Sequence, residues 1–138
     1  MFDVKTTTLK KSTDCGAACM VSFLDYYGQT VTPEEMVEEL HTGVAGCTGK
    51  DIMQACRNHG LEPKCFKIDS QEVCRVDRPS IIWWKYNHWV ICCGMDETGK
   101  VVIMNPSRGR YGVSESLFNA FYSGVAIFNG EPPEPPEE

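Results

Sequence analysis

The stretch DCGAACMVSFLDYYG, residues 14–28, decides the fold. Asp14 can cap a helix, the run 15–27 is apolar on most sides, and Gly28 can end it. A helix that is apolar nearly all round has to be buried, so we expect residues 15–27 to form a central helix. Cys15 would be the first residue of that helix.

Two further helices are expected directly after this one. In TPEEMVEEL, residues 32–40, Thr32 can cap, Pro33 fits the first turn and Glu35 completes a capping box. The glutamates of this segment are typical of a solvated helix face. The segment KDIMQACRNHG, residues 50–60, follows the candidate cap Thr48 and gives a third helix.

From residue 80 the pattern changes to β-branched and aromatic runs, which indicate strands. The tetrapeptide DETG, residues 96–99, is a good hairpin turn between two of them. Helices followed by an antiparallel sheet are the α+β class. The expected strands are 61–68, 80–86, 88–96, 100–106 and 125–129, with short helical segments at 70–74 and 114–124.

Length and charge limit the possible functions. The 138 residues fit one domain, which we place at 1–130, followed by an acidic, proline-rich tail or linker at 131–138. A net charge of -6 argues against a nucleic-acid partner, which needs a basic surface. The sequence has neither an 18-residue apolar run nor the apolar core of a signal peptide, so we expect a cytoplasmic location without membrane insertion.

The eight cysteines allow three interpretations: disulfides, a metal site or reduced thiols. Without a secretory signal we favour reduced thiols. The spacings match no common zinc template, so we expect no metal and no cofactor. Residues that fall within apolar helix or strand patterns are interpreted as small buried hydrophobes: Cys19, Cys56, Cys92 and Cys93.

Cys15 differs from the other cysteines because it begins a helix. Unpaired N–H groups and the helix dipole at this position favour a thiolate, so we expect a lowered pKa and a nucleophilic sulfur. Gly16 next to it would leave room for a substrate carbonyl. The alternative is that Cys15 is one more buried thiol.

His88 is the candidate base. It begins a strand beside the apolar Trp89, whereas His41 and His59 lie at positions typical of surface or capping residues. A third group has to fix the imidazole tautomer, and Asn105 ends the strand that pairs with the His88 strand. The alternatives are a structural histidine at a strand end and a simple Asn-Pro turn at 105–106.

Five successive blocks resemble the C39 family of peptidases, which process bacteriocins and often stand at the N-terminus of ABC exporters. The blocks run in order from about residue 9 to about residue 128. They are DCGAACMVSFLDYYG, GCTGKDIMQACRNHGL, RPSIIWWKYNHWVI, NPSRGRYGVS and LFNAFYSGVAIF.

This resemblance implies a papain-like fold with Cys15 as nucleophile, His88 as base and Asn105 where the family usually has aspartate. It implies cleavage of the leader of a ribosomally made peptide after a Gly-Gly or Gly-Ala type motif, coupled to export. The implied partners are that leader peptide and the membrane domain of an ABC transporter. The family's oxyanion glutamine is replaced by Leu9, and losing one such donor typically costs roughly a hundred- to a thousandfold in rate.

Three functions therefore remain open. The first is the active peptidase, with Gly16 and Trp89 as candidate substrate contacts. The second is a weakly active or inactive domain that binds the transport substrate of an exporter; the retained cysteine argues against it and Leu9 favours it. The third is an acyltransferase, because the same thiol chemistry can pass an acyl group to an amine instead of water.

Overall fold

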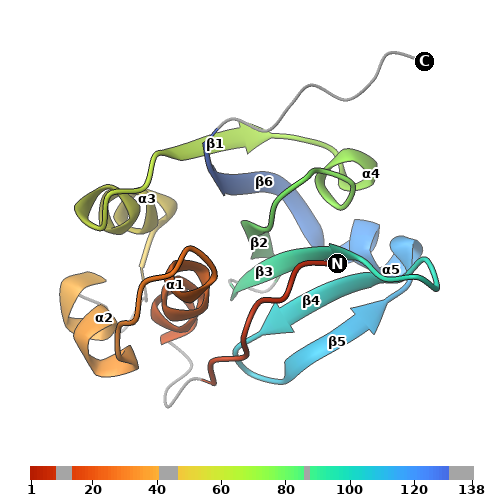
Figure 1. Ribbon diagram of the computed structural model, residues 1–138. Helices are drawn as coiled ribbons and strands as arrows, with labels where there is room; N and C mark the ends of the chain where they lie inside the picture. The colour runs from red at the N-terminus through yellow and green to blue at the C-terminus, as the bar shows by residue number, and fades with distance from the viewer. Residues whose placement is uncertain (9–13, 41–46, 86–87, 131–138) are drawn as a thin grey trace.

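The computed structural model describes residues 1–8, 14–40, 47–85 and 88–130. Among the described residues, three helices come first and all six strands follow them, in the order that the sequence predicts for helices and sheet (Figure 1). The helices are α1 (Cys15–Tyr26), α2 (Pro33–Leu40), α3 (Gly49–Asn58), α4 (Ser70–Val73) and α5 (Glu115–Phe121). The strands are β1 (Pro63–Lys67), β2 (Ser80–Trp84), β3 (His88–Met95), β4 (Val101–Asn105), β5 (Gly109–Val113) and β6 (Tyr122–Asn129).

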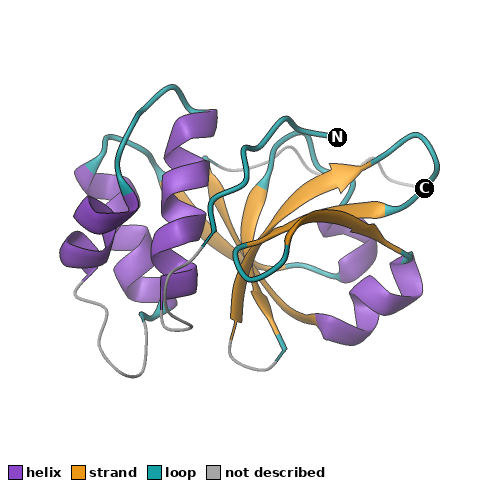
Figure 2. Cartoon of the chain, turned by 90° about the horizontal axis from the view of Figure 1, so that it is seen from below, coloured by secondary structure: helices purple, strands orange, loops and turns teal. Residues whose placement is uncertain are grey.

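The strands form one antiparallel sheet in the order β1-β6-β2-β3-β4-β5. Figure 2 shows α1, α2 and α3 gathered on one side of this sheet and the shorter helices on the other. This arrangement confirms the predicted α+β class.

Strand β3 contributes side chains to two hydrophobic cores, one on each face of the sheet. Side chains alternate between the faces of a strand, so Trp89, Ile91 and Cys93 pack with α1 and the other N-terminal helices. Val90 and Cys92 point the opposite way, into a cluster with α5. The strand is buried along almost its whole length, and its first residue, His88, lies where that burial ends.

Two of the three predicted helix caps form, at Thr32 and Thr48, and the one at Asp14 does not. Thr48 forms the full capping box of α3: its hydroxyl accepts from Asp51 N, and the Asp51 carboxylate accepts from Thr48 N. Thr32 Oγ1 accepts from Glu35 N at the start of α2. Asp14 occupies the N-cap position of α1, but its side chain makes no capping hydrogen bond. The predicted cap at Asp14 is therefore wrong, although the helix begins at Cys15 as expected.

The N-terminal segment, residues 1–8, is tied to both layers. Phe2 N donates to Cys93 O, and the Thr7 and Ser22 hydroxyls lie 2.6 Å apart on the helical side. Arg110 donates to the carbonyl oxygens of Phe2 and Val4. Arg110 of β5 thus anchors the N-terminal segment to the sheet.

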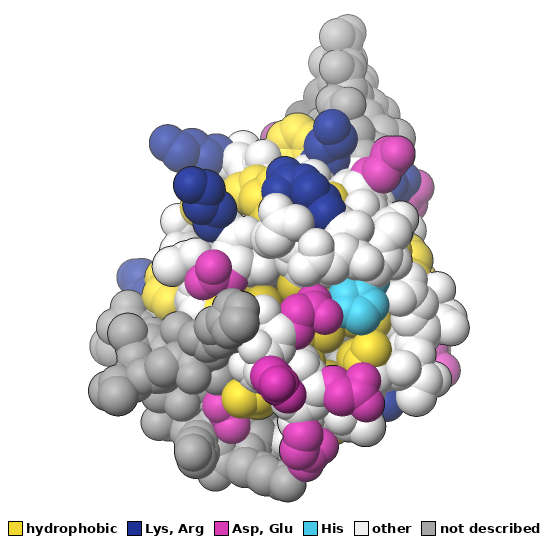
Figure 3. Space-filling model, turned by 90° about the vertical axis from the view of Figure 1, so that its left-hand side faces the viewer, with side chains coloured by type: hydrophobic (Ala, Val, Ile, Leu, Met, Phe, Trp, Pro, Cys, Tyr) yellow, Lys and Arg dark blue, Asp and Glu magenta, His cyan; other side chains and the backbone are white. Residues whose placement is uncertain are grey.

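Acidic side chains gather on the face that carries α2 and α3 (Figure 3). Glu34, Glu35 and Glu38 of α2 are exposed, which confirms the predicted solvated helix face. Among the described residues, no helix is both long enough and apolar enough to cross a membrane.

Candidate active site

Cys15 lies where α1 meets the first residues of β3. The residue is 6% exposed. The thiol interacts with the backbone N–H of Trp89, the residue next to His88, and with the N–H groups of Gly16 and Cys15 itself. One helical turn later, the Cys19 thiol donates to the Trp89 carbonyl oxygen at 3.3 Å. These two contacts to one residue fix the start of α1 against the start of β3.

Burial dominates the electrostatics of this thiol. It raises the pKa of Cys15 above the ordinary value, while the N–H groups of Trp89, Gly16 and Cys15 lower that pKa by smaller amounts. The nearby Asp14 carboxylate raises the pKa further. The expected lowering at the helix start is therefore wrong: desolvation outweighs the N–H groups. A sulfur of this kind needs a base to remove its proton before it can attack.

Gly16 is packed against Cys47. A Cβ added at Gly16 would collide with Cys47 Sγ and would lie 3.5 Å from the Trp89 ring. The Cβ side of Gly16 is therefore occupied by protein and is not the open space that the sequence suggested. Burial, followed by the charge of Cys15, raises the pKa of Cys47 to about 12, so Cys47 is a protonated thiol beside the candidate nucleophile.

His88 and Asn105 lie together at the ends of β3 and β4. His88 Nε2 is 2.7 Å from Asn105 Oδ1. An amide oxygen can only accept, so Nε2 carries the proton in this pair. In a neutral imidazole that leaves Nδ1 unprotonated and able to take a proton. The pairing expected between these two side chains is present.

The turn after β4 fixes which end of the Asn105 amide faces His88. Ser107 N donates to Asn105 Oδ1 at 2.9 Å, and Arg108 N donates to the Asn105 carbonyl at 2.9 Å. A backbone N–H needs an acceptor, so Oδ1 has to face both Ser107 N and His88 Nε2. The Ser107 hydroxyl adds a contact at 3.4 Å from Nε2. The 105–106 sequence is thus a turn start and a histidine partner at once.

Trp89 is mainly a support of the site. It is 5% exposed, its ring meets Trp83 edge-on with centroids 4.6 Å apart, and its Nε1 donates to the Cys47 carbonyl at 3.3 Å. A substrate could touch only a small part of this side chain. The ring holds together the starts of α1, β3 and the segment before α3.

The remaining candidates lie apart from this cluster or outside the described residues. His59 ends α3, and its Nε2 is 2.8 Å from Glu39 Oε1, consistent with a capping role. Leu9 and His41 lie outside the described residues. All eight cysteines are free, and Cys19, Cys56, Cys92 and Cys93 are buried as predicted. Over the ranges that the structure describes, no group of three His, Cys, Asp or Glu side chains is arranged to hold a metal ion.

The family model of the Peptidase C39 family matches residues 3–134. The chain belongs to the peptidase C39 family. Its sequence is 20% identical over 117 residues to the colicin V secretion/processing ATP-binding protein CvaB of Escherichia coli, covering 85% of this chain and 17% of that protein. A probable microcin-H47 secretion/processing ATP-binding protein, MchF of Escherichia coli, is 18% identical over the same shares. The C39 chain thus spans about a sixth of the length of these relatives.

Solved structures confirm the fold of this C39 chain. A double glycine motif protease from an AMS/PCAT transporter, crystallised with the leader peptide, superposes with a TM-score of 0.86 at 24% identity. That match covers 91% of this chain and 90% of the other. The peptidase domain of Streptococcus ComA, a bifunctional ABC transporter of a quorum-sensing pathway, gives 0.82 at 22% identity and covers 91% and 97%. The predicted papain-like architecture, with N-terminal helices on an antiparallel sheet, is therefore confirmed.

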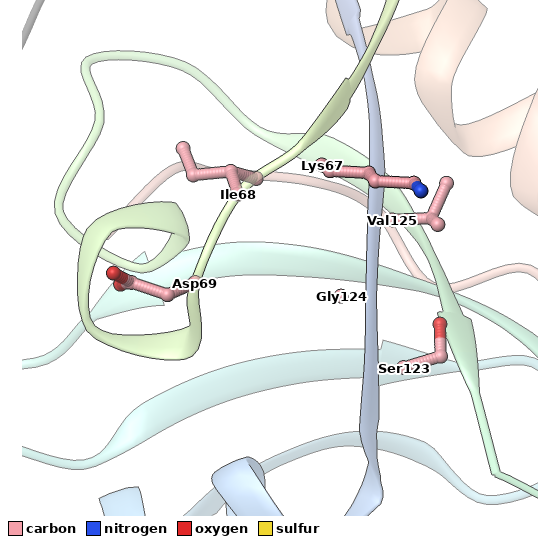
Figure 4. A pocket seen from close by; sticks show the side chains of 6 residues that line it. All are labelled: Lys67, Ile68, Asp69, Ser123, Gly124 and Val125. Atoms are coloured by element: carbon pink, nitrogen blue, oxygen red, sulfur yellow. The ribbon is translucent and has the colours of Figure 1, made fainter.

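One surface hollow among the described residues lies away from this site. It has a volume of about 490 Å³ and is open, between the end of β1 and the start of β6 (Figure 4). Asp69, on its wall, is already used: its carboxylate accepts from Glu72 N and caps α4. None of the candidate site residues lines this hollow, so we assign it no role in the chemistry.

Sequence reasoning missed Cys47, Ser107 and Tyr111 as parts of the site. Cys47 is brought to Gly16 by a segment far along the chain, which no local pattern indicates. Ser107 acts through its backbone N–H, which carries no residue signature. Tyr111, whose hydroxyl accepts from Asn105 Nδ2 at 3.2 Å, lies in β5, a strand that was not expected.

Proposed function

We propose that this chain is a cysteine peptidase domain that cuts the leader of a ribosomally made precursor peptide after a Gly-Gly or Gly-Ala type motif. Its partners would be that leader and the membrane domain of an ABC exporter, at the cytoplasmic face of the membrane. The supporting comparisons are the family membership and the leader peptide and exporters named for its relatives.

The observation that carries the proposal is the junction of α1 and β3. The Cys15 thiol lies against the backbone N–H of Trp89, and the preceding residue, His88, is bonded through Nε2 to Asn105. His88 Nδ1 is then the nitrogen that can remove the thiol proton. The sulfur attacks the scissile carbonyl, His88 protonates the leaving amine, and water releases the acyl group.

The backbone N–H groups at the start of α1 support this chemistry. Those of Gly16 and Cys15 interact with the thiol, and such groups can stabilise developing negative charge during acyl transfer. Because burial raises the pKa of Cys15, the resting thiol is protonated at neutral pH and the base is essential. His88→Ala should therefore be nearly as damaging as loss of the sulfur.

The test is cleavage of a panel of synthetic precursor peptides, each with an amphipathic leader ending in Gly-Gly or Gly-Ala, read by mass spectrometry. We expect cuts after the small pair in the native chain and at least a thousandfold slower cutting in Cys15→Ala. His59→Ala, which removes a histidine far from the site, is the matched control and should cut normally.

A second candidate function is substrate binding without cleavage, favoured by Leu9 and by the raised pKa of Cys15. Its signature would be equal binding of the leader peptides to the native chain and to Cys15→Ala, with no product from either. An acyltransferase would instead join the leader to an added amine. Either outcome would overturn the peptidase proposal.

A further inference from the structure

Tyr111 occupies the far end of the Asn105 amide. Asn105 Nδ2 donates to the Tyr111 hydroxyl at 3.2 Å, while Asn105 Oδ1 accepts from His88 Nε2 and Ser107 N. The described partners of this amide therefore hold it from three directions. In these bonds Tyr111 contacts Asn105 and not His88, so its effect on His88 passes through the Asn105 amide.

An asparagine in this position needs more support than an aspartate. The two ends of an amide differ, and only the oxygen can accept from the imidazole N–H. Asn105 is 5% exposed, so an Nδ2 without its partner would have to turn toward water to form a hydrogen bond. That movement would carry Oδ1 away from His88 Nε2. The Ser107 N–H sets the sense of the amide, and the Tyr111 hydroxyl keeps it in place.

Tyr111 is itself well fixed. It pairs with Ile103 of β4, two residues from Asn105 on the neighbouring strand. The Arg108 guanidinium lies 5.1 Å from the centre of its ring, a cation–π distance. One hairpin, residues 105–111, thus supplies the histidine partner and two groups that orient it.

We propose that Tyr111 is a positioning residue for the base: by accepting from Asn105 Nδ2 it holds Oδ1 on His88 Nε2 and so keeps His88 Nδ1 free for the Cys15 proton. This rests on the proposed function, since it assigns His88 as the base. The hydroxyl is the acting group, so Tyr111→Phe removes the effect while keeping the ring and the Arg108 contact.

The experiment uses the whole chain and two readouts that need no substrate. The first is the tautomer of His88, from ¹⁵N NMR of histidine-labelled protein at a pH where the ring is neutral, with His88→Ala for assignment. The second is the rate at which iodoacetamide modifies Cys15, read by peptide mass spectrometry. Tyr26→Phe, at the opposite end of α1, is the matched control.

We expect Tyr111→Phe to lower the Nε2–H tautomer population and to slow modification of Cys15 about tenfold, the effect of a loss near 1.4 kcal/mol. In an Asn105→Ala background the same change should have no further effect, because its route to His88 is already gone. Tyr26→Phe should match the native chain in both readouts.

Two results would overturn the inference: no change in tautomer or rate for Tyr111→Phe, or the same decrease in the Asn105→Ala background. Failure of the proposed function looks different. In that case His88→Ala would leave the modification rate of Cys15 unchanged, while the tautomer readout would still decide whether Tyr111 orients the His88 ring.

Discussion

At the scale of single residues, the contact of Gly16 with Cys47 sets the packing beside the candidate nucleophile. Glycine is usually a poor helix residue, and replacing it by alanine inside a helix gains up to about 1 kcal/mol. Here an added Cβ would collide with Cys47 Sγ. Overpacking of this kind costs about 1–3 kcal/mol, so the two effects oppose one another and the collision should win.

We therefore expect Gly16→Ala to lower the free energy of unfolding by about 1–2 kcal/mol, measured by urea denaturation under reducing conditions. Cys47→Ala in the same chain removes the sulfur and should restore most of the loss. Cys47→Ala alone is the control. If the Gly16→Ala chain were more stable than the native one, the segment that carries Cys47 would have to move aside at little cost in free energy.

The residues of the site differ in how well sequence could predict them. His88 and Asn105 were predicted to pair because each lies at the end of a clear strand, and they do. The raised pKa of Cys15 was not predictable from the sequence, because it depends on how deeply the tertiary fold buries the thiol. The same holds for Cys47 and Tyr111, which reach the site only through the tertiary fold.

At the scale of elements, the start of α3 is the clearest test of local sequence. Thr48 caps the helix by a reciprocal pair of hydrogen bonds with Asp51, and Gly49 packs on the Trp89 ring beside the site. We expect Thr48→Ala to cost about 1 kcal/mol of stability. Thr48→Ser keeps the hydroxyl and should cost less, with thermal unfolding as the measurement. Equal losses in both variants would mean that the methyl group, not the cap, is important.

Strand β5 shows where local patterns fail. Its residues, GRYGV, include two glycines and an arginine, and only Val113 is buried. Such a composition has weak strand propensity and lacks the alternation of apolar and polar residues that indicates a strand. The strand exists because β4 offers it a free edge and because Gly109 adopts a φ of 92° at the turn. The strands with long apolar runs, β2, β3 and β4, were all predicted.

At the scale of the whole molecule, the buried thiols make stability depend on alkaline pH. Burial raises the pKa of Cys56 and Cys92 to about 12 and that of Cys93 to about 11. These folded thiols stay protonated where unfolded thiols ionise. Their contribution to stability is therefore complete below about pH 8.5 and is lost as the pH rises toward 11–12.

We expect the urea midpoint of the reduced protein to fall steadily from pH 8.5 to 11. Each thiol adds at most about 1.4 kcal/mol per pH unit to that slope. Cys56→Ala should lower stability below pH 8.5, where it removes a buried side chain, and should give a shallower decline above that pH. An identical slope in the two proteins would assign the alkaline loss to other groups.

The division of the site between two layers has a consequence for comparing members of the family. The sulfur is carried by the helical layer and the imidazole by the sheet, and the contact of α1 with Trp89 sets the position of one relative to the other. A substitution deep in that contact could separate them by a fraction of an ångström without touching either. A sequence alignment that checks only for the catalytic residues would then classify an inactive domain as an active enzyme.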